Sequence, residues 1–362
     1  MNSKERANTA IKLKQPDRVP VDYWADKLIT QRLMKALDVR EYEKLLKRHG
    51  IDFRYIEGTV YTGPELEKFE DGSACDIWGV RRKTVMIDPQ NPEKGSYEHV
   101  IDPPLASAQT VKDIESYGHW PSPGWYDYSQ VASMCKKHDG YAVVCGGDRL
   151  NRTAQLKPAM YLRGVEQAML DLALNPRIME AIFERLVDFY LEYNRNIFEN
   201  ARGGIDIFFM GDDFGTQNGL MTSIEMWRKF IKPGFKKFID LAHSYGIAVM
   251  HHTCGAIAEL IPDFIDCGLD ILQSLQPRAK GMDLKKIKEE YGKYICFQGG
   301  IDIQNTLPYG TPADVTREVI ERIKTMAPGG GYILCSAHNI QADVPVENVL
   351  AMYKAALEHG KY

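Results

Sequence analysis

Short apolar runs alternate with longer amphipathic stretches along most of this chain. Eight runs have the length and the β-branched or aromatic content of buried strands. These runs are residues 18–24, 53–57, 141–145, 205–210, 247–251, 270–274, 294–298 and 332–335. Between most of them, apolar residues recur at steps of three and four, which predicts helices. Helices are expected at residues 27–37, 39–49, 159–174, from Pro176, at 224–244, 256–267 and 283–291, from Pro312, and at 346–358.

The alternation of strands and helices predicts an α/β fold with a parallel sheet, and eight such units favour a closed (β/α)8 TIM barrel. No Gly-x-Gly-x-x-Gly motif follows the first run, which counts against a dinucleotide-binding sheet. Residues 61–104 are polar and glycine-containing, and residues 78–82 have the pattern of a hairpin. We therefore expect residues 1–362 to form a single barrel domain with an N-terminal helical and hairpin decoration.

Composition narrows the classes of protein that fit. The chain has 362 residues, 44% of them hydrophobic, and a formal net charge of −4, which argues against nucleic-acid binding. The start of the chain is polar and lacks a signal-peptide pattern, and no apolar run reaches the roughly 20 residues that span a bilayer. The seven cysteines are scattered and odd in number, as expected for reduced thiols. We expect a cytoplasmic protein that binds neither membrane nor nucleic acid.

Candidate chemistry begins where the run at 247–251 ends. His252 and Cys254 are two residues apart, so on an extended segment their side chains point the same way. An imidazole and a thiolate on one side suit a soft metal ion, zinc first. His251 points the other way and is expected to be a packed or outer imidazole.

Other polar residues follow neighbouring runs, and in a barrel the strand ends share one face. Asp212 and Asp213 end the run at 205–210; they are candidate catalytic carboxylates, although a helix cap would also account for them. The candidate third metal ligand lies at the end of the last run or just beyond it. Gln217, Gln298 and Asn339 are candidates for substrate binding. Arg149 and Arg152 could bind an anionic substrate group or pair with Asp212 or Asp213. For the metal, the candidates are His338 and Cys335.

Four motifs resemble those of the uroporphyrinogen decarboxylase superfamily. They are Gly211-Asp212-Asp213-Phe214-Gly215, His252-Thr253-Cys254-Gly255, Phe297-Gln298-Gly299-Gly300-Ile301-Asp302, and His338-Asn339-Ile340-Gln341 followed by Pro345. The resemblance covers nearly the whole chain and implies a single (β/α)8 barrel. The true decarboxylases bind a tetrapyrrole through an arginine-rich N-terminal motif, which residues 21–27 lack.

The sequence is nearer the corrinoid-linked methyltransferases of that superfamily, such as those that act on methylcobalamin and coenzyme M or that demethylate small methyl donors. In that branch a His-x-Cys motif and a distant Cys hold zinc. His252 and Cys254 match the first part, but the distant position falls on His338, with Cys335 in reserve. Tyr161 matches a substrate-pocket tyrosine of the decarboxylases, and a residue packed in the wall would look the same. The resemblance also implies a homodimer, for which no residue marks an interface.

The resulting hypothesis is a zinc-dependent methyltransferase that moves a methyl group between a small methoxy compound or thiol and a corrinoid protein. No segment of the chain has the pattern of a cobalamin-binding domain, so the corrinoid is expected on a partner. Two alternatives stay open. One is a cofactor-free decarboxylase of tetrapyrrole metabolism, and the other is a non-catalytic barrel that binds a metal or ligand.

Overall fold

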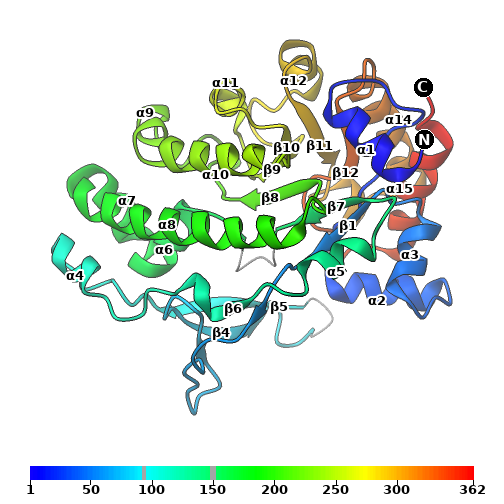
Figure 1. The fold of residues 1–362 in the computed structure, drawn as a ribbon. Helices are drawn as coiled ribbons and strands as arrows, with labels where there is room; N and C mark the ends of the chain where they lie inside the picture. Colours follow the sequence, from blue (N-terminus) through cyan, green and yellow to red (C-terminus); the bar gives the residue numbers. More distant parts are fainter. Residues whose placement is uncertain (92–94, 147–151) are drawn as a thin grey trace.

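Seven parallel strands form one curled sheet at the centre of the protein (Figure 1). The computed structural model describes residues 1–91, 95–146 and 152–362. The strands pair in chain order, and the strands from β7 to β12 are each followed by helical structure that packs outside the sheet, whereas β1 is followed by an insertion. They are β1 (Phe53–Ile56), β7 (Ala142–Cys145), β8 (Ile207–Gly211), β9 (Ala248–His252), β10 (Ile271–Ser274), β11 (Cys296–Ile301) and β12 (Tyr332–Ser336). The predicted (β/α)8 barrel is confirmed in its order and direction of strands.

The eighth position of the barrel is filled without a regular strand. The prediction of a strand at residues 18–24 was wrong in this respect, because the segment pairs only through isolated bridges, Val21 with Leu334 and Ala25 with Ile340. The backbone N–H of Leu334 donates to Pro20, and that of Asp52, just before β1, donates to Val21. Pro20 has no N–H of its own, so a continuous ladder cannot form here. The segment still closes the gap between β12 and β1.

The long amphipathic stretches form the outer helices largely as predicted. The predicted helix at 159–174 is instead two helices, α6 and α7, separated at Gly164, whose φ of 86° few other residues adopt. The helix expected at 224–244 begins with a short α9 and a π-helical turn at Trp227–Ile231, and the one expected at 256–267 contains regular helix only in α11. The other long helices match their predicted ranges to within about three residues.

The outer helices are α2 (Lys27–Ala36), α3 (Tyr42–Arg48), α6 (Leu156–Arg163), α7 (Val165–Leu174), α8 (Pro176–Ala201), α9 (Ile224–Met226), α10 (Lys232–Ser244), α11 (Ile261–Asp266), α12 (Leu284–Tyr291), α13 (Thr306–Tyr309), α14 (Pro312–Met326) and α15 (Val346–His359). Within the described ranges, none of them combines the length and the apolar character needed to cross a bilayer.

The predicted decoration lies between β1 and β7. It holds a three-stranded antiparallel sheet, β3 (Ala74–Cys75), β4 (Arg81–Met86) and β5 (Ser96–Asp102), so the hairpin expected around residues 78–82 is present as the turn between β3 and β4. A second, two-stranded pair joins β2 (Val60–Tyr61) to β6 (Tyr126–Asp127), and the short helices α4 (Val111–Glu115) and α5 (Val131–Lys136) complete the insertion.

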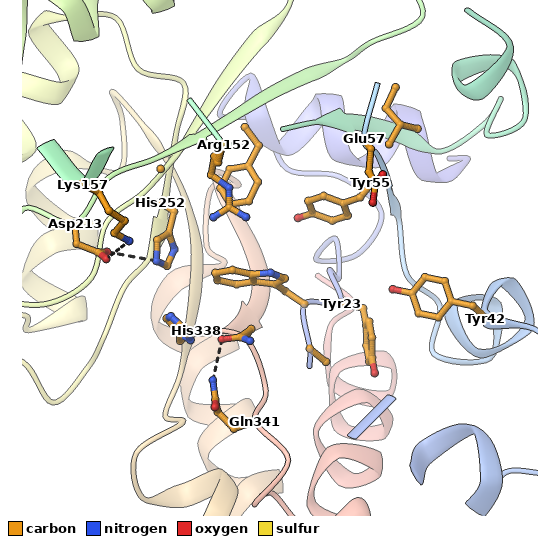
Figure 2. Close-up of a pocket in the computed structure, with 16 residues that line it drawn as sticks. Tyr23, Tyr42, Tyr55, Glu57, Arg152, Lys157, Asp213, His252, His338 and Gln341 are labelled. Carbon is orange, nitrogen blue, oxygen red and sulfur yellow. Dashed lines mark hydrogen bonds and ion pairs between the residues drawn. The ribbon is translucent and has the colours of Figure 1, made fainter. Parts of the chain in front are cut away.

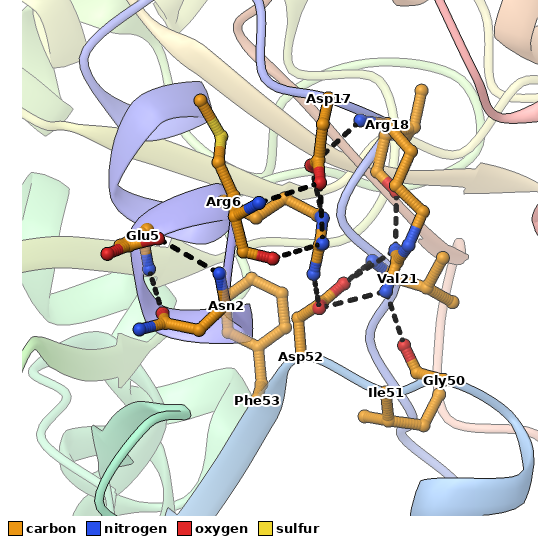
Figure 3. A network of polar contacts seen from close by, with 12 residues as sticks. Asn2, Glu5, Arg6, Asp17, Arg18, Val21, Gly50, Ile51, Asp52 and Phe53 are labelled. Carbon is orange, nitrogen blue, oxygen red and sulfur yellow. Dashed lines mark hydrogen bonds and ion pairs between the residues drawn. The ribbon is translucent and has the colours of Figure 1, made fainter.

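Helix α1 (Ser3–Ile11) closes the barrel at the N-terminal ends of its strands. Ala7 packs against interior residues such as Phe53 and Ile333, and a polar network fixes the helix in place (Figure 3). At its centre Asp52, fully buried, accepts from Arg6 at 2.8 Å and from Arg18 at 2.8 and 3.0 Å. The chemistry of the barrel is therefore left to the opposite end.

Candidate metal centre and pocket

His252, Cys254 and His338 come together at the C-terminal ends of the barrel strands. His252 ends β9, and His338 lies two residues beyond β12. The three potential ligand atoms all lie within 4.8 Å of one another, and the Sγ of Cys254 is 3.2 Å from the Nε2 of His252. One thiol and two imidazoles fit the donor set of a zinc site that leaves a fourth position for substrate.

Gln273 orients His252 from the neighbouring strand. The two residues are register partners of β9 and β10, and the Oε1 of Gln273 hydrogen-bonds the Nδ1 of His252. With that nitrogen donating, the neutral ring presents its Nε2 lone pair toward Cys254. Burial lowers the pKa of His252 well below its usual value, so the ring is neutral. Sequence reasoning placed Gln273 at a strand end but gave it no role.

The thiol of Cys254 is protonated in the metal-free protein. Burial first, and the nearby Asp213 carboxylate second, raise its pKa to about 12. The hydrogen bond with Ser274 and the charge of Lys157 oppose these two effects only in part. A bound metal ion would oppose them further, because metal binding deprotonates a coordinating thiol.

Ser274 ties the two ligand-bearing segments together. Its Oγ donates to the carbonyl of Ala337 at 2.6 Å, directly before His338, and lies 3.7 Å from the Sγ of Cys254. Ser274 adopts a φ of 108°, which is strained for a residue with a side chain. This strained backbone lies between β9 and β12, the two strands whose ends carry the candidate ligands.

The adjacent carboxylates Asp212 and Asp213 have different tasks. Asp213 accepts from Lys157 Nζ at 2.6 Å and from the Cys254 N–H at 3.0 Å, and its Oδ1 lies 3.6 Å from His252 Nε2. Burial opposes its ionisation, but the charge of Lys157 and the hydrogen bonds from Lys157 and the Cys254 N–H outweigh that effect and lower its pKa. Asp213 is therefore an ionised group beside the candidate metal ligands.

Asp212 turns away from the pocket. Its carboxylate accepts backbone N–H groups of Gln155, Leu156 and Lys157 at 2.8, 2.5 and 2.8 Å, which caps the first turn of α6. These contacts match the helix cap that the sequence also allowed for this residue, and Asp212 is not among the residues that line the main cavity, so a catalytic role for it stays a prediction. By fixing the start of α6, Asp212 positions Lys157.

Replacing Asp212 by Ala is expected to lower the free energy of unfolding by about 1–3 kcal/mol, because three buried N–H groups lose their acceptor. Urea unfolding would measure the loss. The matched variant Asp213→Ala should change stability less and reactivity more; a larger stability loss in Asp213→Ala than in Asp212→Ala would contradict the assigned roles.

A cavity of about 390 Å³ opens next to the ligand cluster (Figure 2). His252, His338 and Asp213 lie on one side of it, and Tyr42 and Tyr55 lie on the other. The Trp24 ring centroid is 5.0 Å from that of His252 and 5.2 Å from that of His338. The residues that line the cavity include Tyr23, Trp24, Tyr42, Tyr55, Glu57, Arg152, Lys157, Phe209, Asp213, His252, His338, Asn339 and Gln341.

The other predicted substrate residues divide into those at the pocket and those away from it. Asn339 lines the cavity and accepts from Gln341 at 3.1 Å, whereas Gln298 is buried beside Asp22. Tyr161 lies under the Arg82 guanidinium, 4.3 Å from ring centroid to Cζ, and lines a smaller adjoining cavity. Gln217 bonds Gln276 at 3.2 Å and is not among the residues that line the main cavity.

Two further candidates have definite outcomes. Arg149 lies outside the described residues. Cys335, the reserve ligand, is fully buried in β12 and does not belong to the ligand cluster, which takes His338 instead. Burial raises the pKa of the Cys335 thiol, as expected for a small core residue.

Several pocket residues were missed from the sequence. Trp24, Tyr55, Glu57 and Lys157 all line the cavity but lie outside the motifs. For Tyr55 and Glu57 a signal existed, since they are at the end of the run at residues 53–57, where barrel chemistry is expected.

One solved structure shares this architecture. A methyltransferase from Methanosarcina mazei superimposes with a TM-score of 0.66 at 19% identity, covering 99% of each chain. A D-psicose 3-epimerase solved with D-fructose reaches a TM-score of 0.33 at 13% identity, covering 69% of this chain and 84% of that one. No curated protein sequence matches the chain.

The sequence itself matches a family model. The model describes uroporphyrinogen decarboxylase (URO-D), and the match spans residues 152–359, more than half of the chain. That range contains all three residues of the ligand cluster together with Asp213 and Lys157. The chain therefore belongs to the uroporphyrinogen decarboxylase family.

Proposed function

We propose that this protein is a zinc-dependent methyltransferase that moves a methyl group between a small methoxy compound or thiol and a corrinoid carried by a partner protein. The observation that supports it most is the convergence of His252, Cys254 and His338 on one point beside a cavity. A decarboxylase that works without metal has no need of a thiol and two imidazoles at ligand distance. The structural similarity to a methyltransferase adds support at the level of the fold.

The residues of this chain divide the work. His252, Cys254 and His338 would hold zinc, which when bound acts as a Lewis acid toward a substrate oxygen or sulfur. Asp213, ionised beside the ligands, would orient a substrate proton donor, and Lys157 keeps Asp213 in place. Trp24 and Phe209 form an apolar wall that excludes water from the ligand side.

The size and charge of the cavity favour a small substrate. Its volume of about 390 Å³ is near the lower end of the roughly 300–1,000 Å³ typical of small-molecule sites. Among the described lining residues the cations are Arg152 and Lys157, and Lys157 is already paired with Asp213. A tetrapyrrole with many carboxylates would call for more cations than these.

The corrinoid partner is proposed to dock over the open end of the barrel. In barrel enzymes the reactive face is built from the loops at the strand C-terminal ends, and both the ligand cluster and the cavity lie there. A partner approaching along the barrel axis would reach the substrate without passing through the core.

The proposal is tested by metal analysis and by a methyl-transfer assay. Purified protein is expected to hold about one zinc per chain and to change the absorbance of cobalamin with one or more of a panel of methoxy compounds and thiols. Full turnover by protein stripped of metal would overturn it. Conversion of uroporphyrinogen to coproporphyrinogen would establish decarboxylation, the alternative that the family name suggests.

A further inference from the structure

A row of buried polar side chains lies under the pocket. His252, Gln273 and Gln298 are register partners on β9, β10 and β11, so their side chains lie on the same face of the sheet. Gln273 is 1% exposed and Gln298 is fully buried. Burying an amide costs free energy unless it is hydrogen-bonded, so such a row in a barrel interior calls for a functional reason.

The row is bonded at both ends and open in the middle. At one end Gln273 Oε1 bonds His252, and at the other Gln298 Nε2 donates to the Oδ2 of Asp22. Gln273 Nε2 and Gln298 Oε1 are both buried without a partner among the described residues. One is a donor and the other an acceptor on adjacent strands, so the two amides are chemically complementary.

Asp22 connects this row to the tyrosine side of the cavity. Its carboxylate is fully buried and accepts from Tyr55 Oη at 2.6 Å and from the Tyr23 N–H at 2.8 Å. Tyr55 lines the cavity opposite the metal ligands (Figure 2). The hydroxyl of Tyr55 thus connects the buried carboxylate to the cavity.

The surroundings of Asp22 bring the pKa of its carboxyl group closer to neutral pH. Burial raises its pKa to about 6, against the lowering effect of the hydrogen bonds from Tyr55, Tyr23 and Gln298. Burial and the Asp22 carboxylate raise the pKa of Tyr55 well above its usual value. The other titratable or charged groups that act on this pair are Asp52, Tyr42, Cys335, Tyr353 and Arg152.

Resting on the proposed function, we infer that Tyr55 and Asp22 are the proton-exchanging pair of this pocket, and that Gln273 and Gln298 tie the pair to the metal-ligand side. Methyl transfer from a methoxy group requires one proton. The methyl group passes to the corrinoid of the partner protein, and the electron pair of the broken oxygen–methyl bond stays on the oxygen. The oxygen takes the phenol proton of Tyr55, and Tyr55 takes a proton from protonated Asp22. Methylation of a thiol is the reverse: the S–H proton passes to Tyr55 while the phenol proton passes to ionised Asp22.

The pH dependence follows with opposite signs for the two directions. Methoxy cleavage uses protonated Asp22, so kcat should fall as the pH rises through about 6. Thiol methylation uses the ionised form, so kcat should rise over the same range. Tyr55→Phe should lower kcat about 10²- to 10⁴-fold and remove this inflection.

A series of substrates with graded leaving-group acidity separates proton transfer from a merely structural role. The loss in Tyr55→Phe should shrink as the leaving oxygen becomes more acidic, because a better leaving group needs its proton less. Tyr42→Phe is the matched control, since it also removes a cavity phenol but one that makes no hydrogen bond to Asp22; it should retain the inflection. A loss in Tyr55→Phe that is equal across the series would overturn the inference.

An infrared measurement tests the pair without any turnover. The difference between wild type and Asp22→Asn should contain a protonated-carboxyl band that disappears with a midpoint near pH 6 and shifts in Tyr55→Phe. An Asp22 that stays ionised down to about pH 4 would overturn the inference. If the wild-type protein shows this band but transfers no methyl group, the result would instead count against the proposed function.

Discussion

Replacing Cys254 by Ala is expected to abolish stoichiometric zinc binding and to lower methyl transfer about 10³-fold. The thiolate is the softest of the three donors and the one that brings negative charge, so its loss leaves two neutral imidazoles. Loss of an outer partner alone costs about 10- to 100-fold in metal affinity, and a direct ligand should cost more. Lewis-acid catalysis contributes several kcal/mol, and each 1.36 kcal/mol is about tenfold in rate.

A graded series of variants makes this prediction specific. Metal content should be lost in Cys254→Ala and His338→Ala, and affinity should fall about 10- to 100-fold in Gln273→Ala, which removes only the group that orients His252. Cys335→Ala is the matched control, because that cysteine is buried outside the cluster. Loss of zinc in Cys335→Ala with retention in His338→Ala would transfer the third ligand to Cys335. Unchanged metal content and ligand binding in Cys254→Ala would favour the non-catalytic barrel.

The ligand cluster could be predicted because its geometry follows from local rules. Two residues on one extended segment share a side, and the strands of a barrel present their ends on one face. From the sequence alone, those two rules bring His252 and Cys254 together with a residue from the end of β12. They could not distinguish His338 from Cys335, because the choice depends on how the chain turns after β12, where Ser336 Oγ binds the carbonyl of His338 at 2.6 Å.

The division of labour between Asp212 and Asp213 could not be predicted from their adjacency. Successive residues at a strand end point to opposite sides, and only the position of α6 decides which of the two caps a helix. The pocket wall was missed for a similar reason. Trp24 ends the run at residues 18–24 and Lys157 precedes the helix predicted at 159–174, but neither belongs to a motif. Each reaches the site through packing between distant parts of the chain.

Helix α1 was missed although its signal is present. Asn2 and Glu5 form a capping box in which each side chain accepts the other's backbone N–H. The helix is polar over most of its surface, so apolar periodicity alone did not reveal it. Its few apolar residues pack on the barrel interior, and its charge is balanced by groups distant in the sequence.

Replacing Asp52 by Ala is expected to lower the free energy of unfolding by about 3–5 kcal/mol, because Arg6 and Arg18 would lose the buried carboxylate that they share. The Val21 N–H, which Asp52 accepts at 2.9 Å, would also lose its partner at the point where the barrel closes. Urea unfolding would measure the change. Asp17→Ala is the matched control: it also binds Arg6, but its side chain is 41% exposed, so the loss should be well below that of Asp52→Ala.

Asp52→Ala should leave zinc binding intact in the molecules that remain folded, since Asp52 precedes β1 and the ligand cluster lies beyond the opposite ends of the strands. Equal stability losses in Asp52→Ala and Asp17→Ala would show that the network acts as a solvated surface cluster. Loss of zinc from folded Asp52→Ala would show that the two ends of the barrel are coupled. The expected separation places stability at the α1 end and chemistry at the other, the division that parallel barrels allow because each strand has one end for each.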